Sequence, residues 1–314
     1  VYNFNGVPTD HRAIDFPDPF VLRVDSTTYY AYSTGSIFAH LQVIKSTDNL
    51  ATWTYVGDPF VGGGSGWSDL PAGKTWGPSV LAVGNQYVLY YASATRSDGT
   101  QCVGRAVSAS PAGPFVDSET SPMLCAPWLG GSIDPSPFQD SNGNRYLLWK
   151  SEGIPASQGY VPTQLWSSPL SGDGLSIVGA PTALLTTDDS LSSWEFPIIE
   201  GATMIKNPAA AGYVLLYSAF RWETAGYKVG AASCATPTGP CTRTYSTPVL
   251  QSRGAPTAGP GGESVFVGPN GQLLVAFHAW KSGFVGYGVF DVDHARTLRI
   301  LGLTFSSTGL PKIG

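Results

Sequence analysis

Two short stretches, GSIDPSPF at residues 131–138 and DFPDPFV at residues 15–21, decide the fold of this chain. Each places an Asp-Pro pair at the opening of an apolar run. The distance from Asp18 to Asp134 corresponds to two steps of a repeat of roughly 60 residues, which is longer than a helical solenoid repeat and suits one blade of a β-propeller.

The same period appears in a strand pattern that occurs five times. Each copy follows a turn signal and continues as a run of aromatic and aliphatic residues, which is typical of a strand entered through a hairpin. The five runs predict an all-β fold, a five-bladed β-propeller with four-stranded blades, as a single domain over residues 1–314. They are YYAY at 29–32, YVLY at 87–90, YLLW at 146–149, YVLL at 213–216 and LLVA at 273–276.

A second pattern marks the innermost strand of each blade, just before the runs above. In a radial arrangement the innermost strands line a central channel, and their openings converge at one end of it. We therefore expect two aspartates, a glutamate and a tryptophan to meet there. The five openings are DPFVLRV from Asp18, WGPSVLAV from Trp76, DPSPFQD from Asp134, EGATMIK from Glu200 and GGESVFVG from Gly261.

The charge balance narrows the class of partner. The chain has 17 Lys and Arg against 22 Asp and Glu, a net charge of -5, and no basic cluster. Nucleic-acid binding requires a basic surface, so nucleic acid is excluded and a neutral partner is favoured. No apolar run reaches the length of a membrane span, so no membrane partner is expected. Because the chain begins at Val1 without Met, we expect a mature, secreted extracellular protein, and we expect it to be a monomer.

Four cysteines allow three disulfide pairings, and neither a CxxC pair nor a Cys/His cluster with zinc spacing is present. Cys234 and Cys241 flank a turn sequence, so they could bridge the two arms of a hairpin. In the blade order above, Cys102 begins a third strand, and Cys125 lies in the crossing that leads to Asp134, near the same end of the propeller. We therefore predict the pairs Cys102–Cys125 and Cys234–Cys241, which suit an oxidising compartment.

The three acids at the strand openings are the candidates for chemistry. Either aspartate alone would be interpreted as a turn or cap residue, because Asp-Pro is a common turn dipeptide. Three acids at equivalent places favour a functional site, since like charges held together destabilise one another. Two carboxylates with different pKa values are what cleavage of a glycosidic bond needs, because one activates water and the other protonates the departing oxygen.

On these motifs the chain resembles glycoside hydrolase family 43, whose members are five-bladed propeller enzymes acting on furanosides and xylosides. The resemblance covers nearly the whole chain and departs from the common family form at Gly77 and Ser79, where alanine and an acid are frequent. Each motif is short, but their order and spacing match. They are PDPFV at 17–21, TWGPSV at 75–80, SIDPSPF at 132–138, EGATM at 200–204 and FHAW at 277–280.

The resemblance implies a role for each acid. Asp18 would be the general base that deprotonates the attacking water, and Glu200 the general acid that protonates the departing sugar oxygen. Asp134 would modulate the pKa of that acid and orient it. Asp15 is interpreted as a loop acid, because only Asp18 precedes the proline, and Glu263 in the fifth opening is a lesser candidate for the pocket.

Four further residues are candidates for binding. Trp76 is either core filling or a pocket wall on which a sugar stacks, and His40 is a candidate pocket residue. Arg221 either contacts a sugar hydroxyl or Glu200, or is a solvated loop residue. A lone histidine is usually a core residue, but His278 resembles the family histidine that helps to hold a calcium or sodium ion near the channel axis. No cofactor is expected for the chemistry itself.

Together these features predict a secreted, inverting glycoside hydrolase that cleaves arabinofuranosyl linkages in plant-type or related polysaccharides, so the partner is an oligo- or polysaccharide. A β-xylosidase or another furanosidase on the same fold is the alternative within this class. A propeller that binds carbohydrate without catalysis is the alternative of another class.

Overall fold

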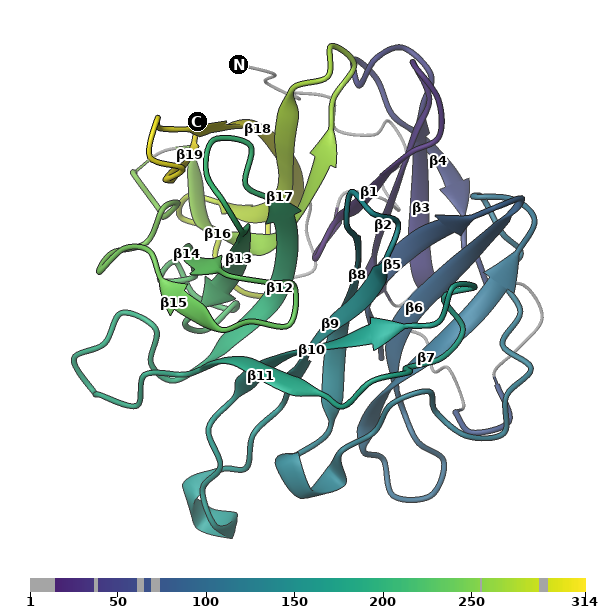
Figure 1. Ribbon diagram of the computed structural model, residues 1–314, viewed down its shortest axis with the longest axis horizontal. Helices are drawn as coiled ribbons and strands as arrows, with labels where there is room; N and C mark the ends of the chain where they lie inside the picture. The colour runs from purple at the N-terminus through teal and green to yellow at the C-terminus, as the bar shows by residue number, and fades with distance from the viewer. Residues whose placement is uncertain (1–14, 37–38, 61–64, 69–73, 255, 288–292) are drawn as a thin grey trace.

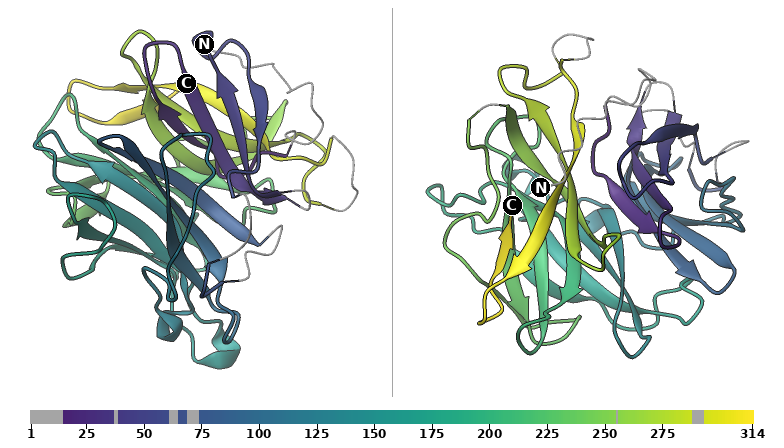
Figure 2. Two further views of the ribbon diagram at one scale, coloured as in Figure 1. Left: turned by 90° about the vertical axis from the view of Figure 1, so that its right-hand side faces the viewer. Right: turned by 90° about the horizontal axis from the view of Figure 1, so that it is seen from above.

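The computed structural model describes residues 15–36, 39–60, 65–68, 74–254, 256–287 and 293–314, which form five antiparallel sheets arranged around a common centre (Figures 1 and 2). The predicted all-β, five-bladed propeller is confirmed. In each blade the strands pair in chain order from the innermost outwards. Within the described ranges the helices are two short turns, η2 (Pro127–Leu129) and η3 (Ala156–Gln158), and neither is long and apolar enough to cross a membrane.

The strands fall into blades as follows. The first blade holds β1 (Phe20–Arg23), β2 (Tyr29–Ser36), β3 (Ala39–Ser46) and β4 (Thr54–Gly57), and the second β5 (Thr75–Val83), β6 (Gln86–Ala94) and β7 (Gln101–Ser108). The third holds β8 (Ser132–Gln139), β9 (Arg145–Ser151), β10 (Gln164–Leu170) and β11 (Thr182–Thr186). The fourth holds β12 (Ile199–Lys206), β13 (Tyr213–Ala219), β14 (Lys228–Cys234) and β15 (Cys241–Arg243), and the fifth β16 (Thr257–Val267), β17 (Leu273–Lys281), β18 (Thr297–Phe305) and β19 (Pro311–Ile313).

The second blade corrects the prediction of four strands in every blade. It has three strands in the part of the chain that the structure describes. Beyond β7 two isolated bridges, Val107 to Val116 and Val103 to Leu124, take the place of a continuous fourth strand. Pro122 lies between the two bridged residues Val116 and Leu124, and a proline cannot donate to a strand ladder.

The sequence pattern of the second strands follows from their position between two neighbouring blades. On β17 every residue from Leu274 to Trp280 is buried, because one face packs on the first blade and the other on the fourth. A strand covered on both faces has a continuous apolar run rather than an alternating one. The outermost strand β4 instead alternates between exposed and half-buried residues.

The ring closes by packing between the first and fifth blades. Each of these blades is built from a continuous stretch of chain, and β1 lies against β16. The Ser264 hydroxyl on β16 donates to the Pro19 carbonyl over 2.8 Å and accepts from the Val21 amide over 3.3 Å. The Cys102–Cys125 and Cys234–Cys241 disulfides are both present, as predicted, and Cys234 and Cys241 are cross-strand partners on β14 and β15.

All five strand openings contain one residue with left-handed backbone. Register shifts in the ladders of β5, β8, β12 and β16 occur at the same place. The sequence alignment of the openings needs a correction of one residue in three blades, because Trp76, Glu200 and Gly261 each precede the left-handed position. The left-handed residues are Asp18 (φ 51°), Gly77 (φ 53°), Asp134 (φ 54°), Gly201 (φ 60°) and Gly262 (φ 62°).

Four of these five residues donate their amide N–H to a side chain of the preceding blade. The acceptors lie on the second strand of that blade in three cases and on its first strand in the fourth. The bonds therefore link neighbouring blades around the channel mouth. They run from Asp18 to His278 Nδ1 (3.0 Å), from Gly77 to Thr34 Oγ1 (3.0 Å), from Gly201 to Asp134 Oδ2 (3.0 Å) and from Gly262 to Ser218 Oγ (2.8 Å).

Substitution of Gly262 by alanine tests how tightly this ring is packed. A Cβ at Gly262 would lie 2.5 Å from Asp18 Oδ1 and 2.6 Å from His278 Nδ1. Gly84 has a similar φ of 58°, but a Cβ there meets nothing within 4 Å. Gly84→Ala should lower the free energy of unfolding by about 1 kcal/mol through backbone strain alone. Gly262→Ala should lower it by about 2–4 kcal/mol, because overpacking adds to that strain.

Urea unfolding of the two variants measures the difference. Equal losses of stability for Gly84→Ala and Gly262→Ala would show that the channel mouth has room for a methyl group, contrary to the packing described above.

Candidate active site

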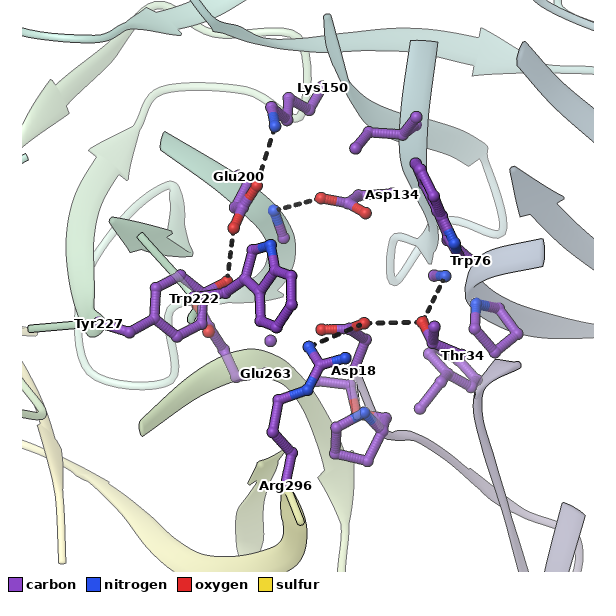
Figure 3. Close-up of a pocket in the computed structure, with 18 of the residues that line it drawn as sticks. Asp18, Thr34, Trp76, Asp134, Lys150, Glu200, Trp222, Tyr227, Glu263 and Arg296 are labelled. Atoms are coloured by element: carbon purple, nitrogen blue, oxygen red, sulfur yellow. Dashed lines mark hydrogen bonds and ion pairs between the residues drawn. The ribbon is translucent and has the colours of Figure 1, made fainter. Parts of the chain in front are cut away.

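A cavity of about 1010 Å³ lies at the channel mouth, and residues from all five blades line it. This volume is at the upper end of the range for small-molecule sites. Asp18, Asp134 and Glu200 all line the cavity. Figure 3 shows Asp18 on one side, and Glu200 and Asp134 together on the other.

Asp18 lies two residues before β1 and is held by contacts from two blades. The Thr34 hydroxyl donates to its Oδ2 over 2.7 Å, and Arg296 Nη1 lies 3.9 Å from the same oxygen. Burial by the cavity walls opposes ionisation, but His278, the Arg296 guanidinium and the Thr34 hydroxyl more than offset it, so the pKa of Asp18 falls well below its usual range. Asp18 is therefore a carboxylate that stays ionised while 29% of its side-chain surface remains accessible.

Glu200 lies near the start of β12 and is buried between two hydrogen-bond donors. Lys150 on β9 donates from Nζ to Glu200 Oε2 over 2.8 Å, and the Tyr227 hydroxyl donates to Oε1 over 2.9 Å. Tyr227 directly precedes β14, and its ring stacks on His278 with 5.6 Å between centroids. Lys150 also donates to Glu152 over 2.8 Å. Both oxygens of Glu200 are thus fixed in position.

Asp134 on β8 connects the third blade to the fourth through the Gly201 amide. Burial and then the charge of nearby Glu200 raise the pKa of Asp134 to about 8. Asp134 therefore holds a proton near neutral pH, with Glu200 beside it. The protonated Asp134 and Glu200 face the ionised Asp18 across the cavity.

The other residues singled out in the sequence have different positions. Trp76 and Arg221 line the cavity, Trp76 half-buried on β5 and Arg221 exposed near its edge, 3.7 Å from Glu223. His40 does not line it, contrary to expectation, because its ring on β3 pairs with Asp58 over 2.7 Å.

Two further acids also line the cavity. Glu263 on β16 is buried, accepts from the Ser218 hydroxyl over 2.6 Å, and has its pKa raised to about 8 by burial. Asp15 accepts from the Arg296 amide and the Tyr287 hydroxyl, both over 2.7 Å, so this loop acid orients neighbouring residues.

His278 is the residue that the family resemblance implies as a cation ligand. Burial lowers the pKa of the ring, so it is neutral, and its Nδ1 accepts the Asp18 amide. Its Nε2 is buried and has no hydrogen-bond partner among the described residues, and the expected ion stays a prediction. Among the described residues no group of three His, Cys, Asp or Glu could hold a metal ion.

Three cavity residues have roles that the sequence interpretation missed: Lys150, Tyr227 and Arg296. Arg296 is buried, its Cζ lies 4.4 Å from the Trp222 ring centre, and its Nε donates to the Tyr287 hydroxyl over 2.9 Å. Lys150 had a detectable signal in the sequence. It directly follows the apolar strand run 146–149, and a charged residue in a buried strand requires a partner of opposite charge. Tyr227 and Arg296 precede their strands in loops of ordinary composition and had no such signal.

The geometry permits acid–base chemistry on a neutral ligand. Asp18 stays ionised, and the protonated Asp134 lies opposite it beside Glu200, so the cavity can remove a proton on one side and supply one on the other. Aromatic side chains, Trp76 and Trp222, provide apolar faces on the same walls. This combination suits hydrolysis of a bond between neutral sugars.

Comparisons with known proteins agree with this interpretation. A family model described as glycosyl hydrolases family 43 matches residues 12–311. The probable arabinan endo-1,5-alpha-L-arabinosidase A of Aspergillus flavus is 25% identical over 296 residues, which cover 88% of this chain and 85% of that protein.

Solved structures give the same result. A thermostable family-43 glycoside hydrolase is 27% identical with a TM-score of 0.80, over 95% of this chain and 92% of that one. An endo-1,4-beta-xylanase from Bacteroides thetaiotaomicron is 25% identical with a TM-score of 0.76, over 96% and 94%. Because the family match spans almost the full length, the chain belongs to glycosyl hydrolases family 43 and is a glycoside hydrolase.

Proposed function

We propose that the chain is an inverting hydrolase of arabinofuranosyl linkages in arabinan or arabinoxylan, with residues 1–314 as one catalytic domain. The observation that carries the mechanism is an ionised Asp18 that faces a protonated Asp134 beside Glu200 across one cavity, and in the proposed mechanism this proton is available to Glu200. The relative named as an arabinan endo-arabinosidase supports the choice of sugar.

In the proposed reaction Asp18 accepts a proton from a water molecule as the water oxygen bonds to the anomeric carbon. The bond from that carbon to the leaving oxygen breaks, and Glu200 transfers its proton to the leaving oxygen. Attack and departure occur on opposite faces of the sugar, so the configuration at the anomeric carbon inverts. Asp134 holds the Gly201 amide, and once its proton is on Glu200 the negative charge of Asp134 favours the protonated form of that acid. No cofactor takes part.

Hydrolysis of a xylan linkage is the second candidate. The specific observation in its favour is the structural likeness to the protein named endo-1,4-beta-xylanase, which extends over 96% of this chain. Product analysis on linear arabinan, branched arabinan and xylan separates the candidates, because only the true polysaccharide releases short oligosaccharides or free pentose.

We further propose that the enzyme is secreted and monomeric. The two disulfides support an oxidising compartment. Light scattering coupled to gel filtration should give the mass of one chain, 33.1 kDa. The protein should be found in the culture medium of its native host, and retention inside the cell would contradict secretion.

Asp18→Asn and Glu200→Gln test the assigned roles. Each should lower kcat on arabinan by about 10²–10⁴-fold, because each removes one partner of the proton transfers. Asp98→Asn is the matched control, since Asp98 is a fully exposed turn residue outside the cavity. Unchanged turnover in both cavity variants would refute the catalytic assignment, and a wild-type chain that binds arabinan without cleaving it would support the binding-propeller alternative.

The stereochemistry of the first product tests inversion. Proton NMR during the first minutes of hydrolysis should show the anomer opposite to that of the substrate linkage, because water attacks directly. The retained anomer as first product would contradict the role of Asp18 as the base that activates water.

The pH profile tests the assigned protonation states. Activity needs Asp18 ionised and one proton on the Asp134–Glu200 pair, so kcat/KM should fall as the pH rises through about 8. Its acid limb should lie below the ordinary range for an aspartate. Asp134→Asn should move the alkaline limb to lower pH, because loss of the neighbouring negative charge makes the remaining proton easier to lose. An alkaline limb unmoved by Asp134→Asn would contradict the coupling.

A further inference from the structure

Lys150 occupies a position between two carboxylates on one wall of the cavity. Its Nζ lies 2.8 Å from Glu200 Oε2 and 2.8 Å from Glu152 Oε2. The side chain of Lys150 is 3% exposed, that of Glu200 10% and that of Glu152 28%. Burial opposes the charge of Lys150, but Glu200, Glu152 and Asp134 raise its pKa well above the usual range, so it remains an ammonium ion.

A buried ammonium ion needs a permanent counter-charge. If Glu200 is the general acid, it must be neutral before each proton transfer, and a lysine paired with Glu200 alone would then be left as an uncompensated buried charge. Such a charge is strongly unfavourable, so a lone lysine partner would hold Glu200 ionised. Glu152 removes this conflict, because its carboxylate stays next to Lys150 whichever form Glu200 takes.

The same contact determines which oxygen of Glu200 carries the proton. An ammonium group has donors and no acceptor, so the oxygen facing Lys150 must remain unprotonated. The Tyr227 hydroxyl faces the other oxygen, Oε1, and a hydroxyl can accept as well as donate. The proton therefore belongs on Oε1, and Figure 3 shows the two contacts on opposite ends of the Glu200 carboxyl group.

We propose that Glu152 and Lys150 are positioning residues for the reaction: Glu152 is the permanent counter-ion of Lys150, and Lys150 confines the transferable proton to Glu200 Oε1. This inference rests on the proposed role of Glu200 as general acid. Neither residue transfers a proton itself. Their effect is on the pH range over which Glu200 can hold one.

Other titratable groups face Glu200, and the variants described below leave all of them except Lys150 and Glu152 unchanged. Those nearest to Glu200 come from every blade that packs against it. They are Asp134 on β8, Lys150 on β9, Glu152 just after β9, Tyr227 before β14, Glu263 on β16, His278 on β17 and, across the cavity, Asp18 and Arg296.

Glu152→Gln is the decisive variant. Without the negative charge of Glu152, the full positive charge of Lys150 acts on Glu200 and favours its ionised form. The alkaline limb of kcat against pH on arabinan should therefore move down by at least about one pH unit. Glu119→Gln is the matched control, because Glu119 also pairs with one basic residue, Arg105 at 2.9 Å, and lies outside the cavity. It removes the same formal charge and should leave the profile unchanged.

Lys150→Met tests the other half of the pair. It removes the positive charge, so the alkaline limb should move up, and the double variant Lys150→Met/Glu152→Gln should bring it back towards the wild-type position. A role in folding alone would lower kcat at every pH and would not produce shifts of opposite sign. If Lys150→Met does not fold, the result of Glu152→Gln decides the question alone.

An aryl arabinofuranoside with an activated leaving group supplies the second readout, because its departure needs no acid. With this substrate the Glu152→Gln shift should disappear. A Glu152→Gln profile identical to wild type on arabinan, or the same shift on both substrates, overturns the inference. Full activity of Glu200→Gln on arabinan would instead overturn the proposed function, so the two failures are distinguishable.

Discussion

The left-handed backbone at each strand opening is the constraint on which the rest of the site depends. It turns the amide of each opening towards the preceding blade, where a side chain accepts it in four of the five cases. Two of the five residues are aspartates, and a non-glycine residue at positive φ costs about 1–3 kcal/mol unless the surroundings offset it. Here the interblade hydrogen bonds provide that compensation, so Asp18 and Asp134 are held where a free loop would not hold them.

Once the openings converge, the acids need different electrostatic environments. Asp18 has an arginine, a hydroxyl and a histidine beside it, and its pKa is lowered. For Asp134 and Glu263 burial is the largest influence, and it raises the pKa of both side chains. Asp18, Asp134 and Glu263 therefore do not ionise together, which reduces the repulsion that their negative charges would create in one cavity.

The sequence predicted the features that recur in every blade and missed the individual side chains that loops bring into the cavity. Five strand openings, five apolar runs and the two disulfides follow from patterns with a fixed period, and they gave the propeller and the convergence of Asp18, Asp134 and Glu200. The one-residue offset of Glu200 was missed, because a bulge shifts the register without changing the spacing enough to show. Arg296 and Tyr227 lie in loops of irregular length, and no period predicts where such loops place a side chain. The expected role of His40 failed for a similar reason, since its partner Asp58 lies in a loop after β4.

The departure of the second blade from the common family form has a structural cause in the same ring. A Cβ at Gly77 would lie 3.0 Å from Asp134 Oδ1 and 3.1 Å from its Cα, so with β5 this close to β8 a side chain there would press on Asp134. Ser79, where an acid is frequent in the family, donates its hydroxyl to the Pro135 carbonyl. An acid in its ionised form has no proton to donate, so it could not make that bond. Both departures thus allow β5 to pack closely against Asp134 and Pro135 of the third blade, and this packing helps to fix the position of Asp134.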